Sequence, residues 1–370
     1  MPSIKQDFLQ LVKLGIGHSR TATLYVNDWS AIEALATKQG LLGVLIDAIE
    51  QIPEPQRPPK QILLLWIGEV MEGYEKRFLD YRSSLAELAA FYNKHGCKMM
   101  VLKGYACGLN WPKPEHRPYG DIDIWLFGEQ KEADAMMASE KGIYIDKSHQ
   151  HHTVFTWGDF SVENHYDFGN VHHHKSSVKL EKVFKELGKD DSHFVELQVA
   201  SHGSATEVYL PSPNLHALFL LKHSMTDFAA FFVTLRQVLD WGFHVEKYSN
   251  EIDWDWLHGV IEQYHMTDFF NCINAICVED LGFQLVDSLR LKVESQLESA
   301  EFRKLKERVL ADILEPVFSR VPPDKRFLPK AWYMYRRWKG NEWKHRMCYN
   351  ESMWSAFWSG IGNHLVKPKV

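Results

Sequence analysis

The sequence predicts an α+β fold: a mixed β-sheet core flanked by N-terminal and C-terminal helical regions. Through the first 95 residues, apolar side chains recur every three or four positions, which is the spacing of one helical face. From residue 96 to 210 the pattern changes to short apolar or alternating runs, which are typical of strands. After Pro211-Ser212-Pro213 the helical spacing returns. We therefore expect four segments: helical 1–95, a mixed core 96–210, helical 211–320, and a basic, aromatic-rich segment 321–370.

The composition excludes several classes of protein. With 370 residues the chain is too long for one small core, and 45% apolar with 24% charged side chains excludes a disordered or fibrous chain. The longest apolar run, Ile62 to Ile67, is far shorter than the roughly 20 residues of a membrane span, and no cleavable apolar segment follows Met1. Five cysteines without metal-site spacing favour a reduced compartment, so we expect a cytoplasmic protein. The net charge of −6 argues mildly against a polyanion as the main partner.

The N-terminal segment contains the most regular helical pattern. Asp28-Trp29-Ser30 can begin a helix, and the proline-rich run 53–59 ends it because proline lacks an amide donor. A long helix follows and ends at His95-Gly96. Its apolar face, which we expect to lie buried along the core rather than to form a coiled-coil partner surface, comprises Leu64, Ile67, Met71, Tyr74, Phe78, Tyr81, Leu85, Leu88 and Tyr92.

Strands are expected in the middle segment. A hairpin is predicted where two strand-like runs are joined by Gly158-Asp159, a turn dipeptide. The predicted strands are 97–102, 121–127, 151–157, 160–166, 194–200 and 207–210.

Two aspartates on one predicted strand are the first candidate functional residues. Side chains two positions apart on a strand point to the same face, so Asp121 and Asp123 lie side by side while Ile122 and Ile124 anchor the strand. Adjacent carboxylates repel each other unless a cation lies between them, and hard oxygen ligands suit Mg²⁺. The pair therefore predicts a divalent-cation site, although a solvated strand can carry the same pattern.

Neighbouring motifs add phosphate-binding groups and a third carboxylate. Gly104 follows Lys103 at the end of a buried strand, where backbone amides at a helix N-terminus can approach a phosphate. Arg117 offers a planar fork for phosphate oxygens, with an ion pair to the aspartates as its structural alternative. Glu163 and His165 share one face of a later strand. If that strand pairs beside the aspartates, Glu163 becomes a third ligand of the same metal ions.

The strand–glycine–helix, Asp-x-Asp and later acid resemble the layout of the polymerase-β-like nucleotidyltransferase superfamily. More narrowly, the chain resembles uncharacterised bacterial nucleotidyltransferases over roughly residues 20–290, and the resembling segments are 102–104, Arg117 with 120–123, 162–165, 211–214, 220–223 and 235–241. The resemblance implies a nucleotidyltransferase-like core and metal-dependent transfer of a nucleotidyl group from a nucleoside triphosphate such as ATP. The acceptor is then a hydroxyl of a small molecule, a sugar derivative or a protein.

The residues would share this work in a two-metal mechanism. Asp121, Asp123 and Glu163 would hold Mg²⁺, with Mn²⁺ as the alternative, while Lys103, Gly104 and Arg117 would bind the nucleotide. His165 would orient Glu163, act as an acceptor-side base, or be a hydrogen-bonded structural residue. The remaining supporting residues are His151 or His152 beside the nucleotide, Lys222 and His223 on the far wall of the cleft, and an ion pair between Arg236 and Asp240.

Two departures from the superfamily keep an alternative open. Its Gly-Ser pair at the phosphate-binding helix is Gly104-Tyr105 here, so the serine hydroxyl is absent, and sixteen residues separate Gly104 from Asp121. A catalytically degenerate nucleotide-binding or regulatory protein of the same fold fits these departures. We expect Lys103 to replace the missing donor in the active alternative.

Two further clusters have both a functional and a structural interpretation. His149, His151 and His152, with the run His172-His173-His174, suggest zinc, but adjacent histidines cannot all face one ion, so solvated loops are favoured. Between Lys325 and Arg346, basic residues alternate with tryptophan and tyrosine, a pattern that suits a nucleic-acid strand or a membrane surface. We favour a helix whose tryptophan face packs on the body while its basic side chains stay solvated. A nucleic-acid modifier that uses this segment is the third functional alternative.

Overall fold

The computed structural model describes residues 4–26, 28–171, 174–201, 203–323, 326–356 and 358. Within these residues, each helix is too short or too polar to span a lipid bilayer. The α-helices are α1 (Ile4–Gly15), α2 (Trp29–Gln39), α3 (Leu42–Gln51), α4 (Lys60–Val70), α5 (Arg77–Lys94), α6 (Tyr105–Gly108), α7 (Gln130–Lys141), α8 (Lys175–Leu187), α9 (Pro213–Ala230), α10 (Leu235–Lys247), α11 (Trp254–Gln263), α12 (Thr267–Ala275), α13 (Asp287–Leu297), α14 (Ala300–Leu314), α15 (Phe327–Gly340) and α16 (Glu342–Cys348). The shorter helical turns are η1 (Glu54–Gln56), η2 (Met71–Lys76), η3 (Pro114–His116) and η4 (Ile276–Asp280).

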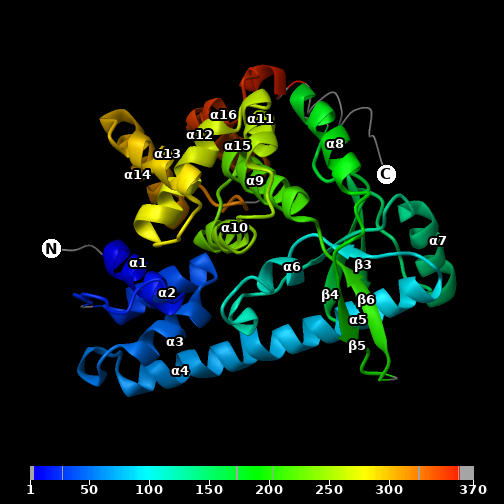
Figure 1. Cartoon of the computed structure of the whole chain (residues 1–370), viewed down its shortest axis with the longest axis horizontal. Helices are drawn as coiled ribbons and strands as arrows, with labels where there is room; N and C mark the ends of the chain where they lie inside the picture. The colour runs from blue at the N-terminus through cyan, green and yellow to red at the C-terminus, as the bar shows by residue number, and fades with distance from the viewer. Residues whose placement is uncertain are drawn as a thin grey trace. The chain divides into compact units, whose positions relative to one another are not determined.

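The chain forms two compact units, each built from three separate stretches of sequence. The first unit comprises residues 1–74, 110–117 and 220–350, and the second comprises 75–109, 118–219 and 351–370. This division is not the one into four consecutive segments, which stays a prediction. The second unit contains the β-sheet, which Figure 1 shows beside α5.

The sheet is mixed, which confirms the predicted α+β fold. Its six strands run in the order β3-β4-β2-β1-β6-β5. Strand β2 is parallel to β4 and β1 is parallel to β6, whereas the remaining neighbours are antiparallel. The strands are β1 (Met100–Val101), β2 (Ile122–Trp125), β3 (His152–Trp157), β4 (Phe160–His165), β5 (Phe194–Gln198) and β6 (Ala205–Tyr209). The predicted hairpin is confirmed, while the expected strand 97–102 is reduced to two residues.

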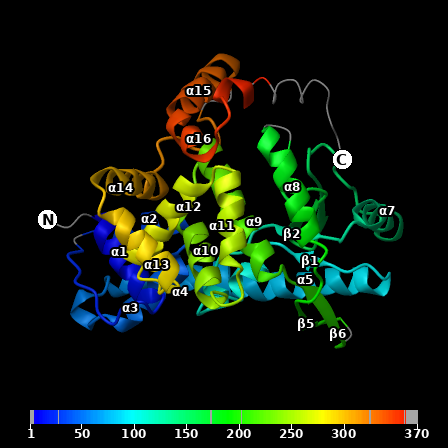
Figure 2. The ribbon, with the colours of Figure 1, turned by 45° about the horizontal axis from the view of Figure 1, so that its top comes forward.

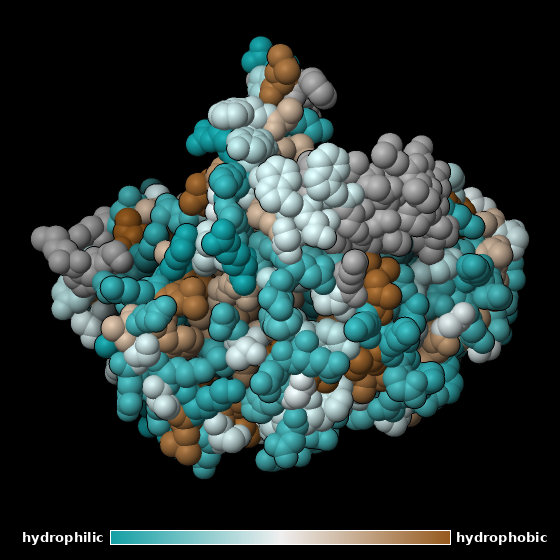
Figure 3. Space-filling model, turned by 90° about the horizontal axis from the view of Figure 1, so that it is seen from above, coloured by the Kyte–Doolittle hydropathy of each residue, from teal (hydrophilic) through white to brown (hydrophobic). Residues whose placement is uncertain are grey.

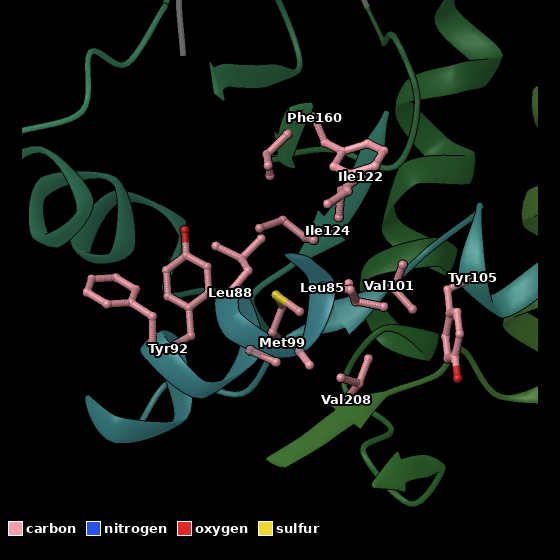
Figure 4. Packing of buried hydrophobic residues seen from close by; sticks show 14 of the residues in the cluster. Leu85, Leu88, Tyr92, Met99, Val101, Tyr105, Ile122, Ile124, Phe160 and Val208 are labelled. Atoms are coloured by element: carbon pink, nitrogen blue, oxygen red, sulfur yellow. The ribbon is translucent and has the colours of Figure 1, made fainter. Parts of the chain in front are cut away.

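One face of the sheet is buried beneath α5 and α7. Ile122 and Ile124 of β2 belong to the same apolar cluster as Leu85 and Leu88 of α5, and Figure 4 shows these side chains pointing toward one another. Met137 of α7 completes this side of the cluster. Because side chains alternate along β2, those at 123 and 125 point to the opposite face of the sheet, and Asp121 comes directly before the strand.

The opposite face is partly covered by α8, as the turned view in Figure 2 shows. Trp125 lies against Phe168, with 4.4 Å between ring centroids, and its Nε1 donates to the carbonyl of Gly188 just after α8. Phe184 of α8 stacks on Phe168. This aromatic group supports the sheet face on which the predicted carboxylates lie.

The first unit is helical, and a buried ion pair lies within it. The Nε and Nη2 atoms of Arg117 donate to the two carboxylate oxygens of Asp240, at 2.8 and 2.9 Å. Trp111 donates from Nε1 to the same carboxylate. At the start of this unit, Asp28 caps α2 by accepting from the amide of Ala31, as the sequence predicts. The helical run does not continue unbroken to residue 49, because Gly40 adopts a left-handed conformation between α2 and α3.

The predicted face of the long helix is confirmed in its second half and wrong in its first. Tyr81, Leu85, Leu88 and Tyr92 are buried, but Leu64, Ile67 and Met71 are exposed. Their places are taken by Trp66 and Val70, which are buried. Between the two halves, η2 is a π-helix, which holds more residues per turn than an α-helix. The buried face that continues through Tyr74 therefore falls one residue earlier than a uniform helix predicts.

The C-terminal aromatic residues divide into two kinds. Trp343 packs between Phe228 and the guanidinium of Arg308, as expected of a helix packed on the body. Trp332, by contrast, is 61% exposed and stacks on Tyr335. The basic side chains are not all solvated either, because Lys344 is buried and pairs with Asp312. Lys325 lies outside the described residues.

All five cysteines are free and buried. Exposed large hydrophobic side chains include Leu64, Leu65, Ile67 and Met71 of α4 and η2, whereas on the face shown in Figure 3 hydrophilic side chains predominate.

Candidate active site

Two predicted carboxylates lie directly beside each other on neighbouring strands. Asp123 of β2 is the register partner of Glu163 of the parallel strand β4. Across β4, His152 of β3 is the register partner of His165. The strand pairing that the sequence argument required is therefore present, and it gathers these side chains on one sheet face within the second unit.

Burial differs sharply among these groups. Asp123 and His165 are buried, Glu163 is half-buried, and Asp121, at the start of β2, is exposed. The site therefore grades from an enclosed interior at His165 to an open edge at Asp121. Solutes can reach the edge without displacing the core.

Two cationic side chains reach the same oxygen of Asp123. Lys103 Nζ lies 2.7 Å from Oδ1, and His165 Nε2 lies 3.1 Å from it. His165 Nε2 is also 3.6 Å from Glu163 Oε2, and its Nδ1 is 3.2 Å from the carbonyl oxygen of Asp167. Since both ring nitrogens face oxygen acceptors, the imidazole carries both protons. Burial lowers the pKa of His165, but the hydrogen bonds to Asp123 and Glu163 outweigh it and raise this pKa to about 9.

The three carboxylates differ in their charge balance. Burial raises the pKa of Asp123, but Lys103 and His165 outweigh it and hold this pKa well below its usual range. Partial burial also raises the pKa of Glu163, but the hydrogen bond with His165 outweighs it and leaves this pKa lowered. The pKa of Asp121 is raised, first by burial and then by repulsion from Glu163 and Asp123. Among the described residues, no hydrogen bond or ion pair reaches the Asp121 carboxylate.

This arrangement fits a divalent cation. The Asp121 carboxylate lies close enough to Glu163 and Asp123 to be repelled by both, and no hydrogen bond or ion pair reaches it in the described part of the chain. Ligand atoms within 4.8 Å of one another, however, come from His152, Glu163 and His165, a group without Asp121 or Asp123. A cation beside Asp121 and Glu163 would relieve the repulsion that raises the pKa of Asp121. The donor set also includes imidazole nitrogens, so the site is not built from oxygen atoms alone.

The clustered histidines contribute more to this site than the sequence indicated. His152 Nε2 lies 3.9 Å from Glu163 Oε1, and one ligand atom each from His152, Glu163 and His165 lies within 4.8 Å of the others. Burial lowers the pKa of His152 to about 4, so the ring is neutral near pH 7. The sequence predicts only supporting roles for both histidines. The hairpin turn could have revealed the pair, because His152 lies six residues before Gly158 and His165 six residues after Asp159.

The other histidines of the two predicted zinc runs are distributed differently. The rings of His149 and His151 lie 4.7 and 4.4 Å from that of His152, between ring centroids. His174 Nδ1 lies 3.4 Å from Glu351, and His172 and His173 lie outside the described residues.

Gly104 has a steric role beside the site. Its φ of +54° lies in the left-handed region, and a Cβ there would stand 2.4 Å from the hydroxyl oxygen of Tyr81. That hydroxyl donates to the carbonyl oxygen of Asp121 at 3.3 Å. The helix that follows, α6, has only four residues. The close approach to Tyr81 therefore accounts for glycine at this position, and a phosphate contact stays a prediction.

Three predicted residues belong to the first unit, unlike the carboxylates. The guanidinium of Arg117 forms a bidentate ion pair with Asp240, as described above, and therefore already has a carboxylate partner. Lys222 lies over the ring of Tyr349, and His223 Nε2 lies 3.6 Å from Asp227. Their contributions to a nucleotide site stay predictions.

Two buried acids that the sequence did not single out hold the site's strands in place. Asp134 of α7 accepts hydrogen bonds from Thr153 of β3, Asn164 of β4 and Tyr166. Glu181 of α8 accepts from the backbone amide of Phe168. Together they fix the hairpin and the loop that follows His165.

Comparison with known proteins assigns the chain to a family. A family model described as uncharacterised nucleotidyltransferase matches residues 26–282. Since this range is more than half of the chain and includes every candidate residue above, the chain belongs to the family of uncharacterised nucleotidyltransferases. No curated protein and no solved structure gives a significant match.

Proposed function

We propose that the chain is a metal-dependent nucleotidyltransferase that moves a nucleoside monophosphate from a nucleoside triphosphate to an acceptor hydroxyl. The observation that carries the proposal is the register of β2 and β4, which sets Asp123 beside Glu163 with Asp121 at the open edge. Membership of the nucleotidyltransferase family supports the same reaction class.

Asp121, Asp123 and Glu163 would hold the cation, Mg²⁺ or alternatively Mn²⁺, in a two-metal arrangement. When bound, the cation would neutralise charge on the phosphate oxygens and favour ionisation of the acceptor hydroxyl. In the reaction, the acceptor oxygen forms a bond to the α-phosphorus, the bond from that phosphorus to the bridging oxygen breaks, and pyrophosphate leaves with the electron pair. The acceptor proton passes to solvent or to the exposed carboxylate of Asp121.

Two cationic side chains of the protein, Lys103 and His165, would stabilise the negative charges of the phosphates and carboxylates. Lys103 lies at the edge of the cluster and would supply positive charge toward the phosphates, in place of the hydroxyl missing at Tyr105. His165 would stay behind Asp123 and Glu163 and hold their orientation, because its Nδ1 is anchored on the carbonyl of Asp167. Catalysis in this scheme is mainly positioning and charge stabilisation.

Transfer of label from an α-labelled nucleoside triphosphate tests the proposal. We expect Asp123→Asn to lower transfer roughly 100-fold or more, because the amide keeps the shape but removes the charge that binds the cation. Asp159→Asn, in the exposed hairpin turn of the same unit, is the matched control and should transfer label like the parent. Full divalent-cation-dependent transfer by Asp123→Asn would refute the assignment, and a melting curve shows whether each variant is folded.

One observation favours a catalytically degenerate nucleotide-binding protein as the second candidate. Lys103 and His165 already compensate Asp123, so the interior of the site is stable without an added ion. This candidate predicts that a triphosphate with Mg²⁺ raises the melting temperature of the parent but not of Asp121→Ala/Asp123→Ala, while no label is transferred to any acceptor.

A further inference from the structure

We infer that this site binds a first-row transition-metal ion through Nε2 of His152, a carboxylate oxygen of Glu163 and Nε2 of His165. This donor set shares only Glu163 with the carboxylates proposed above, and it makes His165 a ligand as well as an orienting residue. The inference rests on the proposed function only for what the ion does, and binding of the ion does not require nucleotidyl transfer.

The first support is the geometry of the three donors. The two imidazoles approach opposite oxygens of one carboxylate, with His152 Nε2 3.9 Å from Oε1 and His165 Nε2 3.6 Å from Oε2. Ligands bound at about 2.1 Å around a tetrahedral ion lie about 3.4 Å apart. The two observed separations, each to a different oxygen of Glu163, are slightly longer than this spacing, and one ligand atom from each of the three residues lies within 4.8 Å of the others. The His152 separation is too long for a hydrogen bond.

The second support is the way His165 is held. Its Nδ1 lies 3.2 Å from the carbonyl oxygen of Asp167, which directs Nε2 toward the carboxylates, 3.1 Å from Asp123 Oδ1 and 3.6 Å from Glu163 Oε2. Histidine ligands commonly donate from the other ring nitrogen to a carbonyl or carboxylate, which fixes the ring and its tautomer. The loop that supplies this carbonyl is itself anchored, because the next two amides, those of Phe168 and Gly169, donate to Glu181.

The third support is the state of His152. The residue is only 8% exposed, and among the described residues its Nδ1 has no hydrogen-bond partner. Burying a polar ring without hydrogen bonds is costly, and because Nε2 lies 3.9 Å from Glu163 Oε1, coordination through Nε2 would give this ring a polar partner. The register of β3 and β4 holds this ring opposite His165 without help from side-chain hydrogen bonds.

The donor chemistry selects the ion. Two imidazole nitrogens and one carboxylate suit Mn²⁺, Fe²⁺, Co²⁺ and Zn²⁺, whereas Mg²⁺ prefers an all-oxygen set. On binding, the ion takes the place of the proton on His165 Nε2, which passes to solvent. Asp123 keeps Lys103 as its partner in that state.

Calorimetric titration of the full-length, chelator-treated chain with Mn²⁺, Zn²⁺ or Mg²⁺ alone tests the inference. We expect Mn²⁺ and Zn²⁺ each to bind with a stoichiometry of one ion per chain. We expect the dissociation constant of each to be at least 10-fold lower than that of Mg²⁺. We expect His152→Ala to weaken Mn²⁺ binding at least 10-fold, while His193→Ala, a histidine before the distant edge strand β5, leaves it unchanged.

Pulsed electron paramagnetic resonance of bound Mn²⁺ provides a readout that a structural role would not affect. Imidazole ¹⁴N coupling is expected in the parent and reduced in His152→Ala; the parent spectrum alone decides the question if that variant fails to fold. Equal affinities for Mg²⁺ and Mn²⁺, or bound Mn²⁺ without ¹⁴N coupling, would overturn the inference. If Mn²⁺ binding depends on the histidines but no label is transferred, only the proposed function is refuted. If label is transferred with Mg²⁺ and bound Mn²⁺ shows no ¹⁴N coupling, only this inference is refuted.

Discussion

One carboxylate oxygen of Asp123, Oδ1, pairs with two cationic side chains, those of Lys103 and His165. The same carboxylate is thus a structural anchor and a candidate metal ligand. Its neutral replacement would remove both functions, so activity and stability must be measured together when this residue is changed. Asp121 lacks such partners among the described residues, and its replacement should affect cation binding more selectively.

Gly104 gives a prediction at the residue scale. Gly104→Ala should lower the free energy of unfolding by roughly 2–4 kcal/mol, because the new Cβ meets the Tyr81 hydroxyl and the backbone stays in the left-handed region. Chemical denaturation measures this change. In the double variant Tyr81→Phe/Gly104→Ala the hydroxyl is absent, so the part of the stability loss caused by this clash should be recovered. A double-mutant cycle measures that part.

Gly120→Ala is the control for that experiment. Nothing lies within 4 Å of the position that its Cβ would occupy, and its φ is not positive. We expect a change below about 0.5 kcal/mol. Equal losses at the two glycines would show that contact with Tyr81 does not determine residue 104.

At the scale of elements, the features that could be predicted are those set by residues close together in the sequence. The hairpin followed from Gly158-Asp159, and the alternation around Ile122 and Ile124 placed the aspartates on the face opposite the core. The π-helix η2 was not predictable from spacing, because it changes the number of residues per turn without a proline or glycine at its start. The partnership of Arg117 with Asp240 was missed for another reason: it joins residues 123 positions apart.

The corrected face of α4 yields a second prediction. Trp66→Ala should lower the free energy of unfolding by roughly 3–5 kcal/mol, because the side chain is fully buried. Leu65→Gln, at the adjacent 73%-exposed position, should change it by less than about 0.5 kcal/mol. Urea denaturation of both variants checks this. A larger loss from Leu65→Gln than from Trp66→Ala would contradict the burial of the Trp66 face.

At the scale of the whole molecule, each unit is assembled from separate stretches of chain. The second unit begins at residue 75, well before the sheet, because α5 supplies one side of its core. Sequence composition marks where strands begin, at about residue 96, but it carries no sign that the preceding helix belongs with them. This is why boundaries drawn from composition and units drawn from contacts differ.

Two fragments test this view of the second unit. Residues 96–210 lack Tyr81, Leu85, Leu88 and Tyr92, so the apolar face of the sheet would be exposed to water. We expect this fragment to aggregate or to unfold without cooperativity, and residues 75–219 to show a cooperative thermal transition by circular dichroism. Cooperative unfolding of 96–210 would contradict the assignment of α5 to this core.

The two-residue turn between β3 and β4 has a consequence for how this protein can vary. Because the turn sets which residues face each other, inserting one amino acid between Gly158 and Asp159 would slide one strand past the other by one position. Imidazole and carboxylate would then project from opposite sides of the sheet, although no ligand had been altered. Loop length at this point is therefore as strict a requirement as the identity of any donor, and relatives that keep the site should vary in length elsewhere.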